Sequence, residues 1–293
     1  MVPFGGKFQD FIRNFIKEIQ QLEKGFVMNV NGTNCWISGG LAMVTADLPQ
    51  GNDIAGVLCH NANLGCRSCK ATKNELTNIS FDIYSNGRYH QITDEEFQHI
   101  NGEQTNTARS RLCSQYGLQL SPGPLDSILH DRHQYIPQDA YHAIAGKVAR
   151  LLDCTCLILT SQGENNLIEY WKHFEVPAKW ARLPNPISHR HSFMMSDLLR
   201  ILMIFPFILR RYLTINDIKT TFLDETKIRL NLSRQIDVIN YLIQTWGFCA
   251  KASRKVFSLT INRPDGYFQL QKALNEEFNA LTKVLLFILN ITI

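Results

Sequence analysis

The chain has 293 residues, of which 45% are hydrophobic and 19% charged, and it carries eight cysteines and a formal net charge of +4. It is therefore long enough for one large or two ordinary globular domains, and its cysteines are too widely spread for a small disulfide-stapled secreted domain. The longest apolar runs, at 198–209 and 284–289, are well short of the roughly 20 residues that a membrane span needs, so no transmembrane helix is expected.

Charge and cysteine usage also bear on the partner and the compartment. A pI near 8.6 fits a nucleic-acid partner, although many enzymes without such a partner carry a similar excess of basic residues. The sequence opens on no signal-peptide pattern, which favours reduced thiols and a nuclear or cytoplasmic location.

The first elements are predicted from helical periodicity and turn chemistry. Residues 7–24 place their apolar side chains on one helical stripe, and Gly25 follows as a stop signal. Asn31-Gly32 separates the runs 26–30 and 33–38. Because this dipeptide is the strongest two-residue turn signal, a β-hairpin is expected.

A buried strand and an irregular segment are predicted next. Residues 41–47 form an apolar, β-branched run that ends in an aspartate and a nearby proline, which is typical of a strand end. Residues 52–88 are rich in Gly, Asn and Cys and are expected to be irregular. Residues 93–116 are predicted to be helical, with Thr93 and Glu96 as a capping box.

The rest of the chain is predicted to be nearly all α-helical. The turn Ser121-Pro122-Gly123-Pro124 is the best candidate for an internal boundary, which gives the parts 1–120 and 121–293. Helical periodicity then recurs, with Pro206 kinking the third helix, over residues 138–152, 164–174, 188–213, 233–258 and 269–289.

Two features carry possible metal chemistry. A carboxylate such as Asp47 at a strand end suits a hard cation such as Mg²⁺, although a solvated turn former is the plainer interpretation. Cys66 and Cys69 in a Cys-x-x-Cys spacing suit a soft tetrahedral ion such as zinc. A thiol oxidoreductase is less favoured, because a redox Cys-x-x-Cys normally opens a helix after a thioredoxin-like strand.

Three stretches of the chain together resemble one protein family. They contain, in order, Asp47-Leu48-Pro49, Gly56, His60 and Gly65-Cys66-x-x-Cys69; then Asp139, His142 and Gly146; then Ser196 to Pro206. The first resembles the central signature of CACTA (En/Spm-type) DNA transposases, the second is similar to the Asp-x-x-His stretch of that family, and the third resembles its Glu-bearing helix. The resemblance covers, discontinuously, about the first two thirds of the chain.

The resemblance implies an RNase H-like fold in which three carboxylates hold two Mg²⁺ ions for DNA strand cleavage and transfer. Asp47 takes the position of the second carboxylate and Asp197 that of the third, a glutamate in the family, with Glu164 and Glu169 as alternatives. The only earlier aspartate, Asp10, lies in a predicted helix, so the first carboxylate is missing.

The zinc ligands beyond Cys66 and Cys69 are expected to be histidines. His142 is the third ligand that the Asp-x-x-His resemblance implies, and four histidines compete for the fourth position: His60, His133, His189 and His191. Two other groups have plainer interpretations. Cys154 and Cys156 are interpreted as buried small hydrophobes, and Trp171, Phe174 and Trp180 as core residues rather than a DNA-stacking surface.

The sequence therefore predicts an α/β fold with an incomplete RNase H-like (DDE-type) core and a mainly α-helical C-terminal half. The predicted function is that of a transposase-derived protein that no longer cleaves DNA. Zinc is expected as a structural ion, and Mg²⁺ only if catalysis persists. DNA is the expected partner, and the chain could also form a homo-oligomer. The alternative is a non-enzymatic, zinc-stabilised module that binds DNA or protein. Residues 1–6 are interpreted as the end of a third strand in a truncated copy, so the isolated chain is expected to aggregate.

Overall fold

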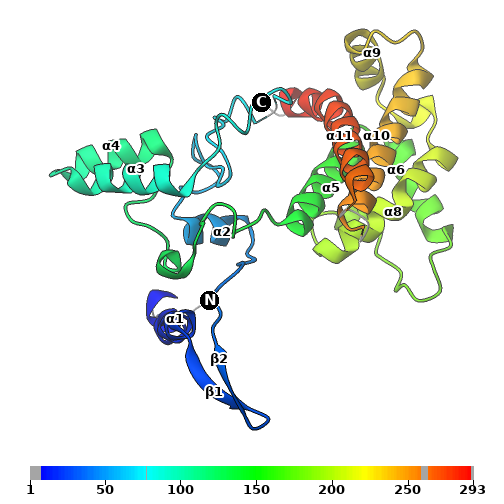
Figure 1. The fold of residues 1–293 in the computed structure, drawn as a ribbon. Coiled ribbons are helices and arrows are strands. Elements are labelled where there is room, and N and C mark those ends of the chain that lie inside the picture. The colour runs from blue at the N-terminus through cyan, green and yellow to red at the C-terminus, as the bar shows by residue number, and fades with distance from the viewer. Residues whose placement is uncertain (1–7, 77, 259–262, 292–293) are drawn as a thin grey trace. The chain divides into compact units, whose positions relative to one another are not determined.

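The computed structural model describes residues 8–76, 78–258 and 263–291 and divides into two compact units (Figure 1). Unit 1 ends at Asp139 and unit 2 begins at Ala140, whereas the predicted boundary followed Leu120. The Pro-Gly-Pro turn lies inside unit 1, against helix α2 (Leu48–Ala55). A Cβ on Gly123 would lie 1.8 Å from the Ile54 carbonyl oxygen, so this turn is a packed element rather than a linker.

The predicted α/β, RNase H-like fold is wrong. The described residues form eleven α-helices and a single two-stranded antiparallel sheet, with no mixed sheet. Residues 38–47 are assigned to neither a strand nor a helix, and the Val44 amide donates one backbone hydrogen bond of 2.8 Å to the Tyr135 carbonyl oxygen. The apolar side chains of this run pack against a helical core, because no neighbouring strand is there to pair with it. The interpretation of residues 1–6 as a strand falls outside the described residues.

The first helix and the hairpin are confirmed. Helix α1 (Phe8–Lys24) ends at Gly25, whose φ of +74° is the left-handed conformation that glycine tolerates. Strands β1 (Phe26–Val30) and β2 (Thr33–Ile37) pair with Val30 opposite Thr33. Asn31 and Gly32 both have positive φ, as the predicted two-residue turn requires.

The predicted helix over 93–116 is two helices, α3 (His90–Gly102) and α4 (Asn106–Tyr116). Helix α3 ends at Gly102, and Thr105 caps α4 by accepting a 3.2 Å hydrogen bond from the Ala108 amide. The capping box of Thr93 and Glu96 is wrong, because α3 starts three residues earlier and both side chains have tertiary partners. Helices α2 to α4 and the short 3-10 helix η2 (Asp126–Ile128) enclose the core of unit 1.

Unit 2 is all-helical in its described part, as predicted for this half of the chain. Four of its helices match predicted segments: α5 (Ala140–Leu157), α6 (Ser161–His173), α10 (Gln235–Val256) and α11 (Pro264–Ile291). The predicted helix at 188–213 is instead α7 (Pro186–His189) followed by α8 (Met195–Tyr212), which continues through Pro206. The 3-10 helix η3 (Ile215–Asp217) and α9 (Thr220–Arg229) were not predicted.

The core of unit 2 is centred on two aromatic side chains from α8 and α10. Phe205 and Trp246 are fully buried, with ring centroids 4.6 Å apart, and the Trp246 indole donates a 3.0 Å hydrogen bond to the Thr155 hydroxyl of α5. Cys154 and Cys156 are buried in the same core, as predicted. Burial raises the pKa of these thiols to about 11 and about 12, which makes them unreactive packing residues.

No helix in the described ranges combines the length and the apolar character that crossing a membrane requires.

Candidate functional site

The two thiols of the Cys-x-x-Cys motif lie side by side in unit 1. The Cys66 and Cys69 sulfurs are 3.6 Å apart and are not joined by a disulfide. Two thiolates bound at about 2.3 Å to one tetrahedral zinc ion are about 3.8 Å apart. The pair therefore already has the separation that two ligands of a zinc ion need.

Two buried arginines hold the backbone around these thiols. Arg67, between the two cysteines, points into unit 1 and donates to the carbonyl oxygens of Ile136 at 3.1 Å and Pro137 at 2.6 Å. Arg88 donates from Nε to the Cys66 carbonyl oxygen at 2.8 Å. Burial lowers the pKa of both guanidinium groups, but each is surrounded by carbonyl oxygens that solvate its charge.

A buried histidine completes this support. The His133 Nδ1 lies 2.9 Å from the Arg67 carbonyl oxygen, and its Nε2 lies 2.8 Å from the Thr93 hydroxyl. Since a carbonyl oxygen only accepts, Nδ1 carries the proton and Nε2 accepts from Thr93. Burial, followed by repulsion from Arg88 and Arg132, lowers the His133 pKa to about 4, so the ring is neutral. Both of its nitrogens are occupied, which removes it from the ligand candidates.

The thiols open into a hollow of about 560 Å³ in unit 1. Its walls are mainly apolar, and twelve residues line it: Leu48, His60, Ala62, Asn63, Gly65, Cys66, Ser68, Cys69, Ala71, Leu76, Ile83 and Gln138. Of the histidines predicted as ligands, His60 alone is among the residues that line this hollow together with Cys66 and Cys69. Its Nδ1 lies 3.5 Å from the exposed Cys59 thiol.

The remaining predicted zinc ligands lie elsewhere in the chain. His142 is on α5, His189 ends α7 and His191 follows α7, all in unit 2. Within the described ranges, no three His, Cys, Asp or Glu side chains stand close enough to form a ready-made metal site. The zinc assignment therefore stays a prediction that depends on the Cys66 and Cys69 pair.

The predicted catalytic carboxylates both serve as helix caps. Asp47 is the N-cap of α2 and accepts a 2.9 Å hydrogen bond from the Gln50 amide. Asp197, in the first turn of α8, accepts a 3.1 Å bond from the Met194 amide. They belong to different units, and the sheet expected to align them is absent from the described residues. Asp10, the earlier aspartate, pairs with Arg13 on α1.

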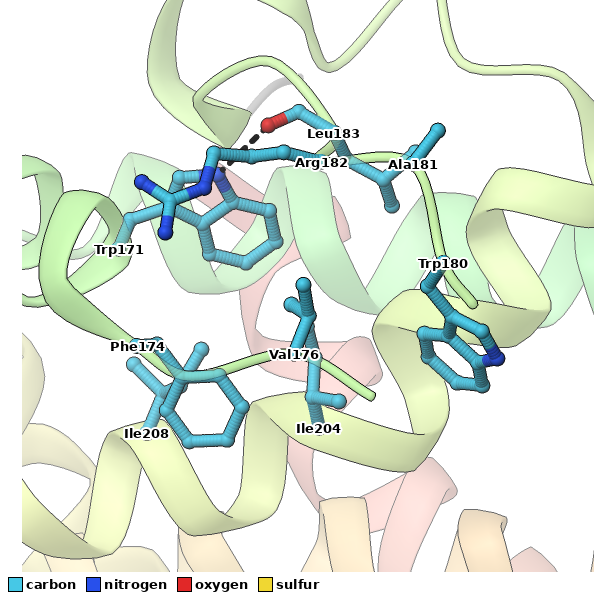
Figure 2. A pocket seen from close by; sticks show the side chains of 9 residues that line it. All are labelled: Trp171, Phe174, Val176, Trp180, Ala181, Arg182, Leu183, Ile204 and Ile208. Carbon is cyan, nitrogen blue, oxygen red and sulfur yellow. Dashed lines mark hydrogen bonds between the residues drawn. The ribbon is translucent and has the colours of Figure 1, made fainter. Parts of the chain in front are cut away.

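The aromatic cluster of unit 2 is a packed cap, which confirms the core interpretation (Figure 2). Trp171 is buried, its indole donates a 3.1 Å hydrogen bond to the Leu183 carbonyl oxygen, and Phe174 and Trp180 pack against the same core. The space left between these side chains is about 10 Å³, at most one water molecule. Arg182 lies along this cap and donates to the Lys172 carbonyl oxygen.

No protein-family model matches the chain, and a comparison with curated proteins finds no match either. The transposase resemblance therefore stays a prediction that depends on the three stretches of sequence. Sequence reasoning had passed over Arg67, Arg88 and His133, which give the thiol pair its fixed geometry. The one available signal was the position of Arg67 between the two cysteines.

Proposed function

We propose that this chain is a non-catalytic, zinc-stabilised DNA-binding module of transposase descent. The observation that carries the proposal is the 3.6 Å separation of the Cys66 and Cys69 sulfurs on a backbone fixed by buried side chains. Zinc sites that stabilise a fold need ligands held in this way, because the ion contributes folding energy only when its ligands converge.

The proposed ligands are Cys66 and Cys69, whose sulfurs lie 3.6 Å apart, and His60, which lines the same hollow. The described residues of the segment 56–89 are almost without regular secondary structure, so a metal cross-link there would replace the stabilisation that helices provide elsewhere. His142, on α5, stays a prediction for a further ligand.

A structural role fits this motif better than a redox role. Redox Cys-x-x-Cys pairs sit at the start of a helix, whose partial positive charge activates the first thiolate. Here Cys66 lies in an irregular segment, and the next helix, α3, begins at His90. All eight cysteines are free, which suits a reducing compartment such as the nucleus or the cytoplasm.

The absence of catalysis is proposed from what the carboxylates do. A two-metal site needs carboxylates that converge on two ions, so that the attacking and leaving oxygens are both held. Asp47 instead caps α2 and Asp197 instead caps α8, and the first carboxylate of the pattern has no counterpart in the sequence. Magnesium is therefore not part of the proposed function.

DNA is proposed as the partner from the resemblance and from the distribution of charge. Unit 2 carries 19 Lys and Arg against 12 Asp and Glu, whereas the sequence of unit 1 carries 11 against 14. An excess of seven positive charges on one unit attracts phosphates, and the attraction weakens steeply as salt is added. We accordingly assign DNA contact to unit 2 and the metal to unit 1.

The test is elemental analysis of the purified chain together with duplex-DNA binding at two salt concentrations. We expect one zinc ion per chain, lost in Cys66→Ser and kept in Cys35→Ser. Cys35 lies in strand β2 and does not line the hollow that contains Cys66 and Cys69. Duplex binding should fall as salt rises. A wild-type chain without zinc contradicts the zinc assignment, and a zinc-loaded chain without salt-sensitive DNA binding contradicts the DNA partner.

A further inference from the structure

A second hollow, of about 470 Å³, opens on unit 2 and combines two aromatic rings with two cations. Phe174 follows the last residue of α6, and Phe207, Arg210 and Arg211 come from the last turns of α8. The spacing of the last three, i, i+3 and i+4, puts them on one helical face. Phe207 is 64% exposed, so much of its ring is open to solvent within the hollow.

The two arginines have no carboxylate partner within the described residues. Two other arginines of unit 2 have such a partner: Arg190 lies 3.2 Å from an Asp153 oxygen, and Arg200 lies 3.9 Å from an Asp197 oxygen. Cations near a helix end offset the partial negative charge there, which accounts for the arginines. It does not account for an exposed phenylalanine within the same hollow.

We propose that this hollow binds single-stranded DNA, with Arg210 and Arg211 on adjacent phosphates and an unpaired base stacked on Phe207. The proposal rests on the proposed function in one respect, the choice of DNA as partner. A phenyl ring offers a stacking face to any base, but only when that base is not already stacked in a duplex. Phe174, packed against the core on its inner side, is the fixed wall of the hollow.

The test is fluorescence anisotropy of the full chain with three labelled probes of equal length, about 20 nucleotides. The probes are oligo(dT), an abasic strand with the same phosphates, and a duplex. We expect oligo(dT) to bind more tightly than the abasic strand. Phe207→Ala should weaken oligo(dT) binding by about 5-fold to 100-fold and leave the abasic strand unchanged, because only stacking is lost.

Charge and stacking are separated by a second variant and a control. Arg210→Gln combined with Arg211→Gln should weaken both single strands and reduce the slope of log affinity against log salt by about 1.4, as two phosphate contacts require. Ile228→Ala is the matched control, since Ile228 is an exposed apolar residue of α9 outside the hollow. It should bind every probe like the wild type.

Three results with these probes would overturn the proposal: equal affinity of the wild type for oligo(dT) and the abasic strand, including no binding to either; unchanged binding by Phe207→Ala; or tighter binding of the duplex than of oligo(dT). An oligo(U) strand of the same length serves as a fourth probe. Tighter binding of oligo(U) than of oligo(dT) would assign the hollow to RNA and overturn the proposal as well. The zinc assignment is judged separately. Strand binding that persists in a chain found to contain no zinc would leave this inference standing and remove the zinc site alone.

Discussion

Arg88 Nε donates a 2.8 Å hydrogen bond to the carbonyl oxygen of Cys66, and this contact links the predicted metal ligand to the interior of unit 1. The same guanidinium donates from Nη1 to Tyr116 and from Nη2 to Leu64, each at 2.9 Å. One planar, five-donor group therefore holds three carbonyl oxygens that a single ammonium could not reach together.

Arg88→Lys should lower the free energy of unfolding by about 2–4 kcal/mol, because at least two buried carbonyl groups lose their donor. It should also weaken zinc binding by about 10-fold to 100-fold, as loss of support behind a ligand does. Urea denaturation and a zinc titration measure the two effects. Arg13→Lys, on the exposed face of α1, is the control and should change neither.

The neutral His133 makes unit 1 sensitive to acid. Its pKa is depressed to about 4 from an ordinary 6.5, so the unfolded chain binds more protons between these values and stability rises with pH there. Stability is fully present above pH 6.5 and should be lost as the pH falls towards 4, by roughly 3 kcal/mol at most. His133→Asn, which keeps a donor for the Arg67 carbonyl oxygen, should flatten the profile measured by denaturation. The exposed His130→Asn should not.

Two glycines in helices of unit 2 should respond to the same substitution with opposite signs. A Cβ on Gly146 of α5 meets nothing within 4 Å, so Gly146→Ala should stabilise by about 0.5–1 kcal/mol through helix propensity. A Cβ on Gly163 of α6 would lie 2.2 Å from the Asp217 carbonyl oxygen, so Gly163→Ala should destabilise the unit. Thermal unfolding of the pair measures both, and equal shifts would mean that the packing around α6 differs from this structure.

The chain should not nick supercoiled DNA with Mg²⁺ or Mn²⁺. Asp47→Asn keeps the oxygen that caps α2, so it should also leave stability nearly unchanged, whereas Asp47→Ala should cost about 1 kcal/mol. Metal-dependent nicking that disappears in both variants would show that Asp47 is catalytic and that another residue supplies the first carboxylate.

Local signals in the sequence predicted local structure well. The stripe of α1, the Gly25 stop and the Asn31-Gly32 turn all depend on neighbours within one element, and all three are present. Residues 41–47 failed as a strand because a β-prone run forms a strand only with a partner. Whether a partner strand lies beside the run is decided by the tertiary structure and cannot be read from the run itself.

The support of the thiol pair could not have been predicted from the same signals. Arginine is almost never fully buried, so periodicity and composition do not mark Arg67 or Arg88 as interior residues. The position of Arg67 between the two cysteines is the only local hint. Thr93 and Glu96 matched a capping box in spacing, but His133 and Lys70 supply their partners from distant parts of the chain. The Cys-x-x-Cys spacing found the candidate site, and only the folded structure shows what fixes its geometry.

The most direct test of the zinc site is a cobalt(II) titration of the metal-free chain, monitored by visible absorption. Cobalt(II) is a spectroscopic substitute for zinc in tetrahedral thiolate sites. We expect saturation at one ion per chain, with thiolate charge-transfer and tetrahedral bands that zinc abolishes. The bands should be lost in Cys66→Ser, weakened in His60→Ala and unchanged in Cys35→Ser. A wild-type chain that shows no such bands, or a Cys66→Ser chain that keeps them, would contradict the assignment of Cys66 and Cys69 as the ligands of a structural zinc ion.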